Sequence, residues 1–154
     1  MIIEIDPETM QLEIKAYVVV HDCGTVLNPL ILDGQIHGGV AQGIGNAFYE
    51  QLKFDEQGQL LNASLADYLL PTALDVPRMQ LGHTVTPSPL NPLGVKGAGE
   101  AGAIPVGALF AQAIEDALEL PRRGVELTEI PLSPNRLWEL AGGQMRALKE
   151  STVG

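Results

Sequence analysis

A glycine-rich stretch, residues 91–105, places the strongest constraint on how this chain can fold. It reads NPLGVKGAGEAGAIP, and four of its residues between 94 and 102 are glycine. Glycines leave few side chains to bury, and they let the backbone turn tightly or approach another group closely. Glu100 is the only acidic residue between Asp75 and Glu115, and it precedes an apolar, helix-like run whose N-terminus favours an anion. A lone carboxylate in apolar surroundings can serve as a general base once its pKa is tuned.

A second glycine-rich segment has the periodicity of a helix. We expect that helix to run from Gly34 to about Gln51, with Asp33 as its N-cap. It contains five glycines, at positions 34, 38, 39, 43 and 45, and each costs about 1 kcal/mol relative to alanine. We therefore expect close packing against backbone or a bound group. Gln35 and Gln42 share one face of the helix. They are either binding residues or, in the alternative, solvated amides on a tightly packed buried helix.

The remaining segments predict an α+β fold with mixed strands and about three helices. Alternating apolar residues and turn residues indicate two hairpins and two further strands. The expected strands are residues 2–5, 11–20, 51–54, 60–65, 79–86 and 125–130. The other expected helices are residues 103–118 and 135–149. Ser133 and Pro134 provide an N-cap and a first helical residue for the last of them.

The composition narrows the domain organisation and the functional class. With 154 residues, we expect one domain over residues 1–150 and a frayed tail over residues 151–154. Nine basic residues against 19 acidic ones give a net charge of −10, which argues against nucleic acid or anionic membranes as partners. The single cysteine, Cys23, excludes an internal disulfide framework. Without an apolar run of about 18 residues or a secretory leader, the chain is expected to be soluble and cytoplasmic. Met1 leads straight into strand-like residues, which indicates a chain cut from something longer.

Two local motifs suggest metal or nucleotide binding, but their context argues against both. His21, Asp22 and Cys23 are potential metal ligands, yet adjacent residues at a strand end point in opposite directions. We interpret them as a loop that leaves a strand. Residues 97–102 match GxGxxG ahead of a helix, but a dinucleotide site needs a hydrophobic strand before the first glycine. Prolines at 87, 89 and 92 exclude a central strand there.

Three longer motifs carry a resemblance to a known family. They are VHDCGTVLNP at residues 20–29, GQIHGGVAQGIG at residues 34–45 and PLGVKGAGEAG at residues 92–102. In this order they resemble the C-terminal part of the molybdenum-binding large subunit of the xanthine oxidase family. The large chains of the carbon monoxide dehydrogenase and aldehyde oxidoreductase type are the most similar. The resemblance extends over nearly the whole chain.

The resemblance implies part of a molybdopterin-dependent oxidoreductase that oxidises an electrophilic carbon. Its metal is held by molybdopterin, in the plain or cytosine dinucleotide form, and no residue of this chain is expected to ligate the metal. Glu100 would be the general base beside the metal. The expected cofactor-binding residues are Gln35, Gln42, Gly97 and Gly99. The glutamines would hydrogen-bond the pterin, and the glycines would give the backbone room; Lys96 would either support the loop or bind a substrate anion.

The large subunit of this family is several times longer than this chain. The resemblance therefore implies a fragment or a split subunit. Its partners would be the remaining large-subunit portion and the iron–sulfur and flavin (FAD) subunits, since one cysteine cannot hold a cluster. The substrates implied are carbon monoxide, aldehydes and N-heterocycles. The alternative function is a non-catalytic assembly module that docks on a partner large subunit.

Overall fold

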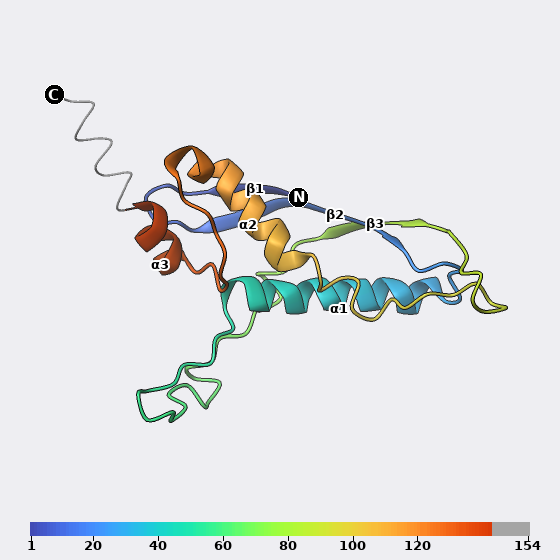
Figure 1. The fold of residues 1–154 in the computed structure, drawn as a ribbon, viewed down its shortest axis with the longest axis horizontal. Helices are drawn as coiled ribbons and strands as arrows, with labels where there is room; N and C mark the ends of the chain where they lie inside the picture. The colour runs from blue at the N-terminus through green and yellow to red at the C-terminus, as the bar shows by residue number, and fades with distance from the viewer. Residues whose placement is uncertain (143–154) are drawn as a thin grey trace.

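A three-stranded mixed sheet forms one layer of the fold in the computed structural model, which describes residues 1–142. Strands β1 (Ile2–Ile5) and β2 (Leu12–Asp22) pair antiparallel, with Ile5 opposite Leu12. Strand β3 (Met79–Thr84) pairs with β2 in parallel. The first predicted hairpin and the predicted strand at 79–86 are therefore confirmed. Together with helices α1, α2 and α3, described below, the sheet confirms the expected α+β class (Figure 1).

Helix α1 (Pro29–Phe48) lies along the sheet and begins earlier than expected. Its N-cap is Asn28, whose side-chain oxygen accepts a hydrogen bond from the Ile31 backbone N at 3.1 Å. The prediction that Asp33 caps this helix was wrong, because an asparagine followed by proline at the first helical position is a complete start signal five residues upstream. Asp33 instead lies inside the helix, and its Oδ1 is 2.9 Å from Nε2 of His83 on β3.

Helix α2 (Val106–Ala117) and the residues just before it pack on α1 at its glycines, and these contacts bring the α1 backbone unusually close to its neighbours. A Cβ atom added to Gly43 would lie 2.5 Å from Cβ of Val106. One added to Gly39 would lie 3.0 Å from the backbone N of Ala103. The expectation that the glycine-rich helix packs tightly against backbone is confirmed for this face. The core beside it is formed by apolar residues that include Val40, Ile44, Val106, Phe110 and Ile114.

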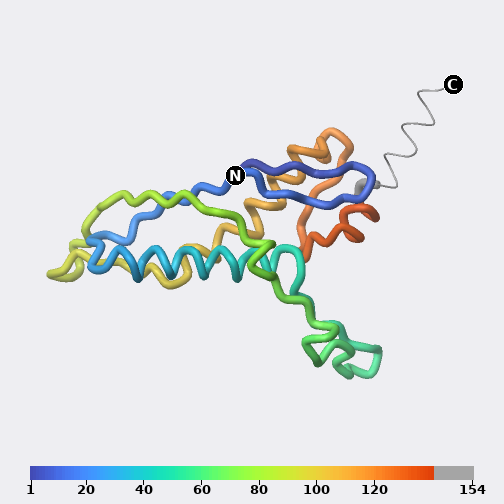
Figure 2. Tube along the Cα trace, turned by 180° about the vertical axis from the view of Figure 1, so that it is seen from behind, coloured from blue at the N-terminus to red at the C-terminus, as the bar shows by residue number. Residues whose placement is uncertain are grey.

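Residues 51–76 contain the turn of the predicted second hairpin, but the two predicted strands do not form. They extend away from the sheet and the helices as an arm (Figures 1 and 2), and their only strand-like contact is an isolated bridge between Phe54 and Leu60. An isolated two-stranded hairpin is marginally stable, and this segment has no third strand or helix to cover it. The side chain of Asn62 orders the arm instead, by donating to the Gln51 carbonyl at 2.6 Å and accepting from the Lys53 backbone N at 2.9 Å.

In the C-terminal third, one predicted helix is shorter than expected and one predicted strand does not form. The helix expected at 103–118 begins only at Val106, and the predicted strand at 125–130 is absent from the structure. The 3₁₀ turn η1 (Leu120–Arg123) leads into that segment, where the Leu127 backbone N donates to the Glu115 carboxylate at 2.7 Å rather than to a neighbouring strand.

The last helix starts where the sequence indicates. Ser133 caps α3 (Pro134–Leu137), which continues as the π-helical turn η2 (Trp138–Gly142). The rest of the helix predicted to reach residue 149 and the predicted tail at 151–154 lie outside the described residues. Within residues 1–142, no helix has the length and apolar character needed to cross a membrane.

The glycine contact between α1 and α2 gives a first prediction. Replacing Gly43 by alanine places a methyl group against Val106, and we expect this overpacking to lower the free energy of unfolding by about 1–3 kcal/mol. Gly34→Ala is the matched control on the same helix, because no atom lies within 4 Å of its Cβ position. The control should raise the free energy of unfolding by about 0.5–1 kcal/mol. Urea unfolding measures both, and equal effects of the two substitutions would contradict the packing argument.

Candidate functional site

The glycine-rich loop is attached to the end of β2 by backbone hydrogen bonds. The Thr25 N donates to the Gly94 carbonyl at 3.0 Å, and the Lys96 N donates to the Cys23 carbonyl at 2.7 Å. Gly24 and Val95 form an antiparallel bridge between them. Gly24 has φ +68°, and a Cβ on it would meet the Gly94 carbonyl oxygen. A side chain at position 24 would therefore separate the two segments.

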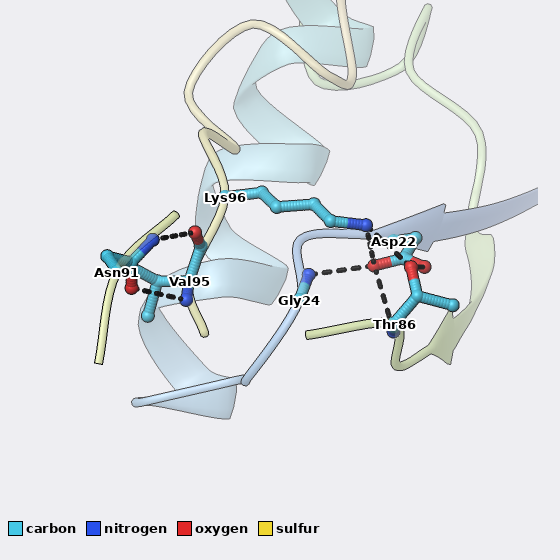
Figure 3. Close-up of polar contacts among 6 residues, drawn as sticks. All are labelled: Asp22, Gly24, Thr86, Asn91, Val95 and Lys96. Carbon is cyan, nitrogen blue, oxygen red and sulfur yellow. Dashed lines mark hydrogen bonds and ion pairs between the residues drawn. The ribbon is translucent and has the colours of Figure 1, made fainter. Parts of the chain in front are cut away.

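A small polar cluster reinforces this attachment (Figure 3). Lys96 Nζ lies 3.3 Å from Asp22 Oδ1 and 2.5 Å from Thr86 Oγ1. The Thr86 hydroxyl donates to Asp22 Oδ2, and the Gly24 N donates to Asp22 Oδ1 at 2.7 Å. We call Asp22, Thr86 and Lys96 the Asp22 latch. These contacts match the first of the two predicted roles of Lys96, support of the loop.

The latch keeps Asp22 ionised. The hydrogen bond from the Thr86 hydroxyl contributes most, followed by the Gly24 backbone N, and together with Lys96 they hold the pKa of Asp22 well below its usual range. Figure 3 also shows the Asn91 side chain bonded to both the N and the carbonyl of Val95, at 3.1 and 2.9 Å. The residues just before the central glycines are thus held from both sides.

The other end of the loop rests on α1. Ala98 packs with Cys23, Leu32 and Ile36 in a small apolar cluster. A Cβ on Gly102 would lie 2.4 Å from the Ile36 carbonyl oxygen, so the loop backbone touches the helix backbone directly. Figure 1 shows the loop running along α1 toward the start of α2. Residues 97–101 therefore form a short span between two firmly held ends.

This span borders an open recess of about 530 Å³, which we call the Glu100 recess. Its lining residues are His21, Gly97, Ala98, Gly99, Glu100, Ala101, Ile104 and Pro105. No atom lies within 4 Å of the Cβ positions of Gly97 and Gly99, so the space beside both glycines is open. Glu100 is exposed, and within residues 1–142 its carboxylate has no hydrogen-bond or ion-pair partner. The recess thus offers one free carboxylate beside bare backbone.

Gln35 and Gln42 lie outside the recess, on the exposed surface of α1. Their spacing places them on the same face as Gly39, which touches the loop at residues 102 and 103. The structure therefore brings Gly97, Gly99 and Glu100 into one recess, and it leaves the two glutamines on the adjoining helix face. Gly34 and Gly38 on α1 also have nothing within 4 Å of their Cβ positions.

His21 is the one recess residue whose role the sequence did not indicate. The sequence indicates it only as a possible metal ligand with Asp22 and Cys23, and the described residues contain no group of three side chains that could hold a metal ion. Instead, His21 Nε2 is buried without a hydrogen-bond partner, on a residue that lines the Glu100 recess. The strand alternation of β2 was the available signal, because it places His21 on the same face as the buried Tyr17.

A larger cavity of about 710 Å³ lies elsewhere, between the first hairpin, the end of α1 and the base of the arm. It is lined mainly by apolar side chains such as Met10, Phe48 and Leu74. Tyr49, at its edge, donates to Asp75 at 2.9 Å, and burial together with this carboxylate raises the pKa of Tyr49 to about 12. The two carboxylates in its lining are already paired, Glu13 with Lys15 and Asp75 with Tyr49 and Thr72. The Glu100 recess, which has a carboxylate without a partner, is therefore the better candidate site.

A glycine-walled recess beside a free carboxylate, built on a loop between a sheet and a helix, is typical of a domain that binds a small molecule or cofactor. Comparison with known proteins identifies the family to which this domain belongs. Residues 1–77 match the molybdopterin cofactor-binding domain, and the chain belongs to that family. The resemblance drawn from the sequence motifs is confirmed.

Relatives with known names agree with this assignment. The chain is 40% identical over 141 residues to the carbon monoxide dehydrogenase large chain of Hydrogenophaga pseudoflava. This alignment covers 90% of this chain and 17% of the relative. It is 41% identical over 137 residues to the nicotine 6-hydroxylase large subunit of Paenarthrobacter nicotinovorans, covering 89% of this chain and 16% of the relative. This chain thus spans about one sixth of the length of these relatives.

Solved structures show the same fold. Quinoline 2-oxidoreductase from Pseudomonas putida 86 superposes with a TM-score of 0.84 at 41% identity, over 91% of this chain and 18% of that one. The aldehyde oxidoreductase of Desulfovibrio gigas superposes with a TM-score of 0.77 at 28% identity, over 91% of this chain and 15% of that one. The fold of this chain is therefore that of a segment within molybdenum hydroxylase large chains.

The Asp22 latch gives a pH-dependent prediction. Because the folded-state pKa of Asp22 is lowered, its contribution to stability is fully present above about pH 4, the unfolded-state pKa, and is lost as the pH falls toward the folded-state value. Asp22→Asn should therefore lower the urea midpoint at pH 7, and the gap to the wild type should narrow as the pH falls below about 4. Asp67→Asn, at an exposed aspartate of the arm, should show no such gap at pH 7. A gap that widens in acid would contradict the latch.

Proposed function

We propose that this chain is the part of a molybdenum hydroxylase large subunit that supplies its general base, Glu100, and contacts to its pterin cofactor. The observation that carries the proposal is the free Glu100 carboxylate in a recess walled by Gly97 and Gly99. A general base must reach its proton without a competing partner. Membership of the molybdopterin cofactor-binding domain family supports the choice of cofactor.

The residues present fit such a cofactor. Gly97 and Gly99 leave the space beside the loop backbone open, so a rigid ring system or the metal centre can approach closely. Gln35 and Gln42 are exposed on the adjoining helix face, and each amide offers both donors and an acceptor for the polar edge of a pterin. Molybdopterin, in its plain or cytosine dinucleotide form, is the cofactor that we assign to this surface.

In the proposed mechanism, each residue of this chain has a limited task. The molybdenum cofactor, when bound, supplies the oxidation chemistry at an electrophilic carbon. Glu100 accepts the proton released in that reaction on a carboxylate oxygen, which is free for this purpose in the structure. The Asp22 latch and the contact of Gly102 with α1 keep the carboxylate in place. Accurate placement of a base accounts for a large share of its catalytic effect.

The partners and the location are part of the same proposal. The rest of the large subunit would close the open side of the recess, and iron–sulfur and FAD-containing subunits would carry the electrons away. The substrate class is a small molecule with an oxidisable carbon. Relatives are named for carbon monoxide and nicotine, and a structural match for quinoline. We assign the complex to the cytoplasm, where a free buried cysteine such as Cys23 stays reduced.

One observation favours a second candidate, a non-catalytic docking module. The arm at residues 51–76 exposes large apolar side chains, including Leu65 and Leu74, which are 77% and 97% exposed. Exposed apolar surface of this kind often marks a protein interface. A module that only docks would leave Glu100 without a chemical task, so a substitution at Glu100 separates the two functions.

The first experiment replaces Glu100 by glutamine in the assembled enzyme. Glutamine keeps the size and polarity of the side chain but cannot accept the proton, so kcat should fall on the order of 10²-fold or more. Molybdenum content and subunit composition, measured by mass spectrometry on the same sample, should stay unchanged.

Glu56→Gln is the matched control, because Glu56 is an exposed glutamate in a turn of the arm, outside the recess. It should leave turnover at the wild-type rate. If Glu100→Gln also turns over at that rate with assembly intact, the general-base function is wrong and the docking function stands.

The isolated chain offers a second test. The Glu100 recess is open, and its remaining walls are assigned to the missing portion of the large subunit. We therefore expect the purified 154-residue chain to carry far less than one equivalent of molybdenum and to show no turnover. Elemental analysis by plasma mass spectrometry checks this. A molybdenum content near one per chain would show that these residues hold the cofactor by themselves.

A further inference from the structure

Three buried side-chain nitrogens within residues 1–142 have no hydrogen-bond partner: His21 Nε2, His83 Nδ1 and Arg123 Nη1. Of the three residues, only His21 lines the Glu100 recess. A buried polar atom without a partner is costly, and native proteins keep few of them. An unsatisfied atom at the edge of a binding recess therefore indicates a partner that arrives with a ligand.

The neighbouring strand carries a histidine at the same level, and one of its two ring nitrogens has a hydrogen-bond partner. His21 on β2 is opposite His83 on β3 in the parallel register. His83 Nε2 lies 2.9 Å from Oδ1 of Asp33 on α1, whereas His83 Nδ1 is unpartnered and lines neither the Glu100 recess nor the larger cavity. His21 lies instead where the glycine-rich loop passes, and the loop residues around it carry hydrogen or methyl side chains. The one acidic side chain in the lining, Glu100, makes no hydrogen bond to His21 Nε2.

The chemistry of the recess restricts the ligand. It has two polar side chains, the Glu100 carboxylate and the His21 imidazole, and its other lining side chains are apolar or absent. Binding sites of this type orient a small molecule by a few polar contacts against an apolar surface. A neutral imidazole can donate from Nε2, and the acceptor would be an oxygen or a ring nitrogen of the ligand.

We propose that His21 is a second ligand-binding residue of the Glu100 recess, where its Nε2–H donates to an oxygen or ring nitrogen of the bound molecule. The inference rests on the proposed function of the recess. The acceptor atom belongs either to the pterin cofactor or to the substrate, and the two sources give different results in the experiment below.

The test compares His21→Phe with His21→Gln. Phenylalanine keeps the ring but removes the donor, and glutamine places an amide N–H close to the position of Nε2. Three quantities are measured: the unfolding midpoint of the chain, the molybdenum and pterin content of the assembled enzyme, and KM and kcat. His37→Gln is the matched control, because His37 is an exposed histidine whose Nδ1 donates to the Asp33 carbonyl of its own helix.

We expect His21→Phe to leave the unfolding midpoint unchanged or to raise it, since no internal hydrogen bond is lost. The same substitution should weaken binding about tenfold, the usual effect of one neutral hydrogen bond, and His21→Gln should restore most of it. A fall in molybdenum and pterin content assigns the acceptor to the cofactor. A higher KM at full cofactor content and nearly unchanged kcat assigns it to the substrate.

The inference is overturned if His21→Phe leaves cofactor content and KM at their wild-type values. It is also overturned if His21→Phe lowers the unfolding midpoint and His21→Gln fails to restore binding, because His21 is then a packing residue. Glu100→Gln, measured in parallel, reports on the proposed function separately. Loss of kcat in that variant together with unchanged binding in His21→Phe rejects only the role of His21.

Discussion

The direct contact of the α1 backbone with residues 102–106 is the constraint on which the rest of the structure depends. Gly39, Gly43 and Gly102 provide it, since any side chain at these positions would overlap a neighbouring atom. Each glycine inside a helix costs about 1 kcal/mol, and the packing that it permits offsets that cost. Because Gly102 is only two residues after Glu100, the same contact determines where the carboxylate lies relative to α1.

The loop that carries Glu100 is held at its two ends by different kinds of interaction. At the α1 end the interaction is close packing, which is insensitive to salt and pH. At the β2 end it combines backbone hydrogen bonds with the partly exposed Lys96–Asp22 pair. Exposed ion pairs contribute little by themselves, so the backbone bonds and the acceptors on Asp22 do most of the anchoring. Only five residues lie between these two ends. The position of the Glu100 carboxylate is therefore defined although no partner holds the side chain.

Local signals in the sequence were sufficient for the elements that depend on local interactions. The alternation in β1 and β2 and the Ser133–Pro134 helix start were both readable in this way. The predicted hairpin in the arm is limited to its turn and one antiparallel bridge, because a strand pattern extends into strands only where a third strand or a covering layer exists. The contact of Lys96 with Asp22 joins residues 74 positions apart in the chain. The position of His21 likewise depends on the distant glycine-rich loop, and no local pattern reports either contact.

Seven glycines of α1 and the glycine-rich loop fall into two groups, those packed against a neighbouring atom and those beside open space. Gly39, Gly43 and Gly102 are explained by neighbours within the structure, whereas Gly34, Gly38, Gly97 and Gly99 have no neighbour within 4 Å of a Cβ position. At none of these four is a positive backbone φ recorded that would require glycine. Within α1, alanine would be more stable by about 1 kcal/mol at each open position. The open glycines are therefore best explained by a group outside the chain that approaches the backbone closely, as the proposed cofactor and the rest of the large subunit would.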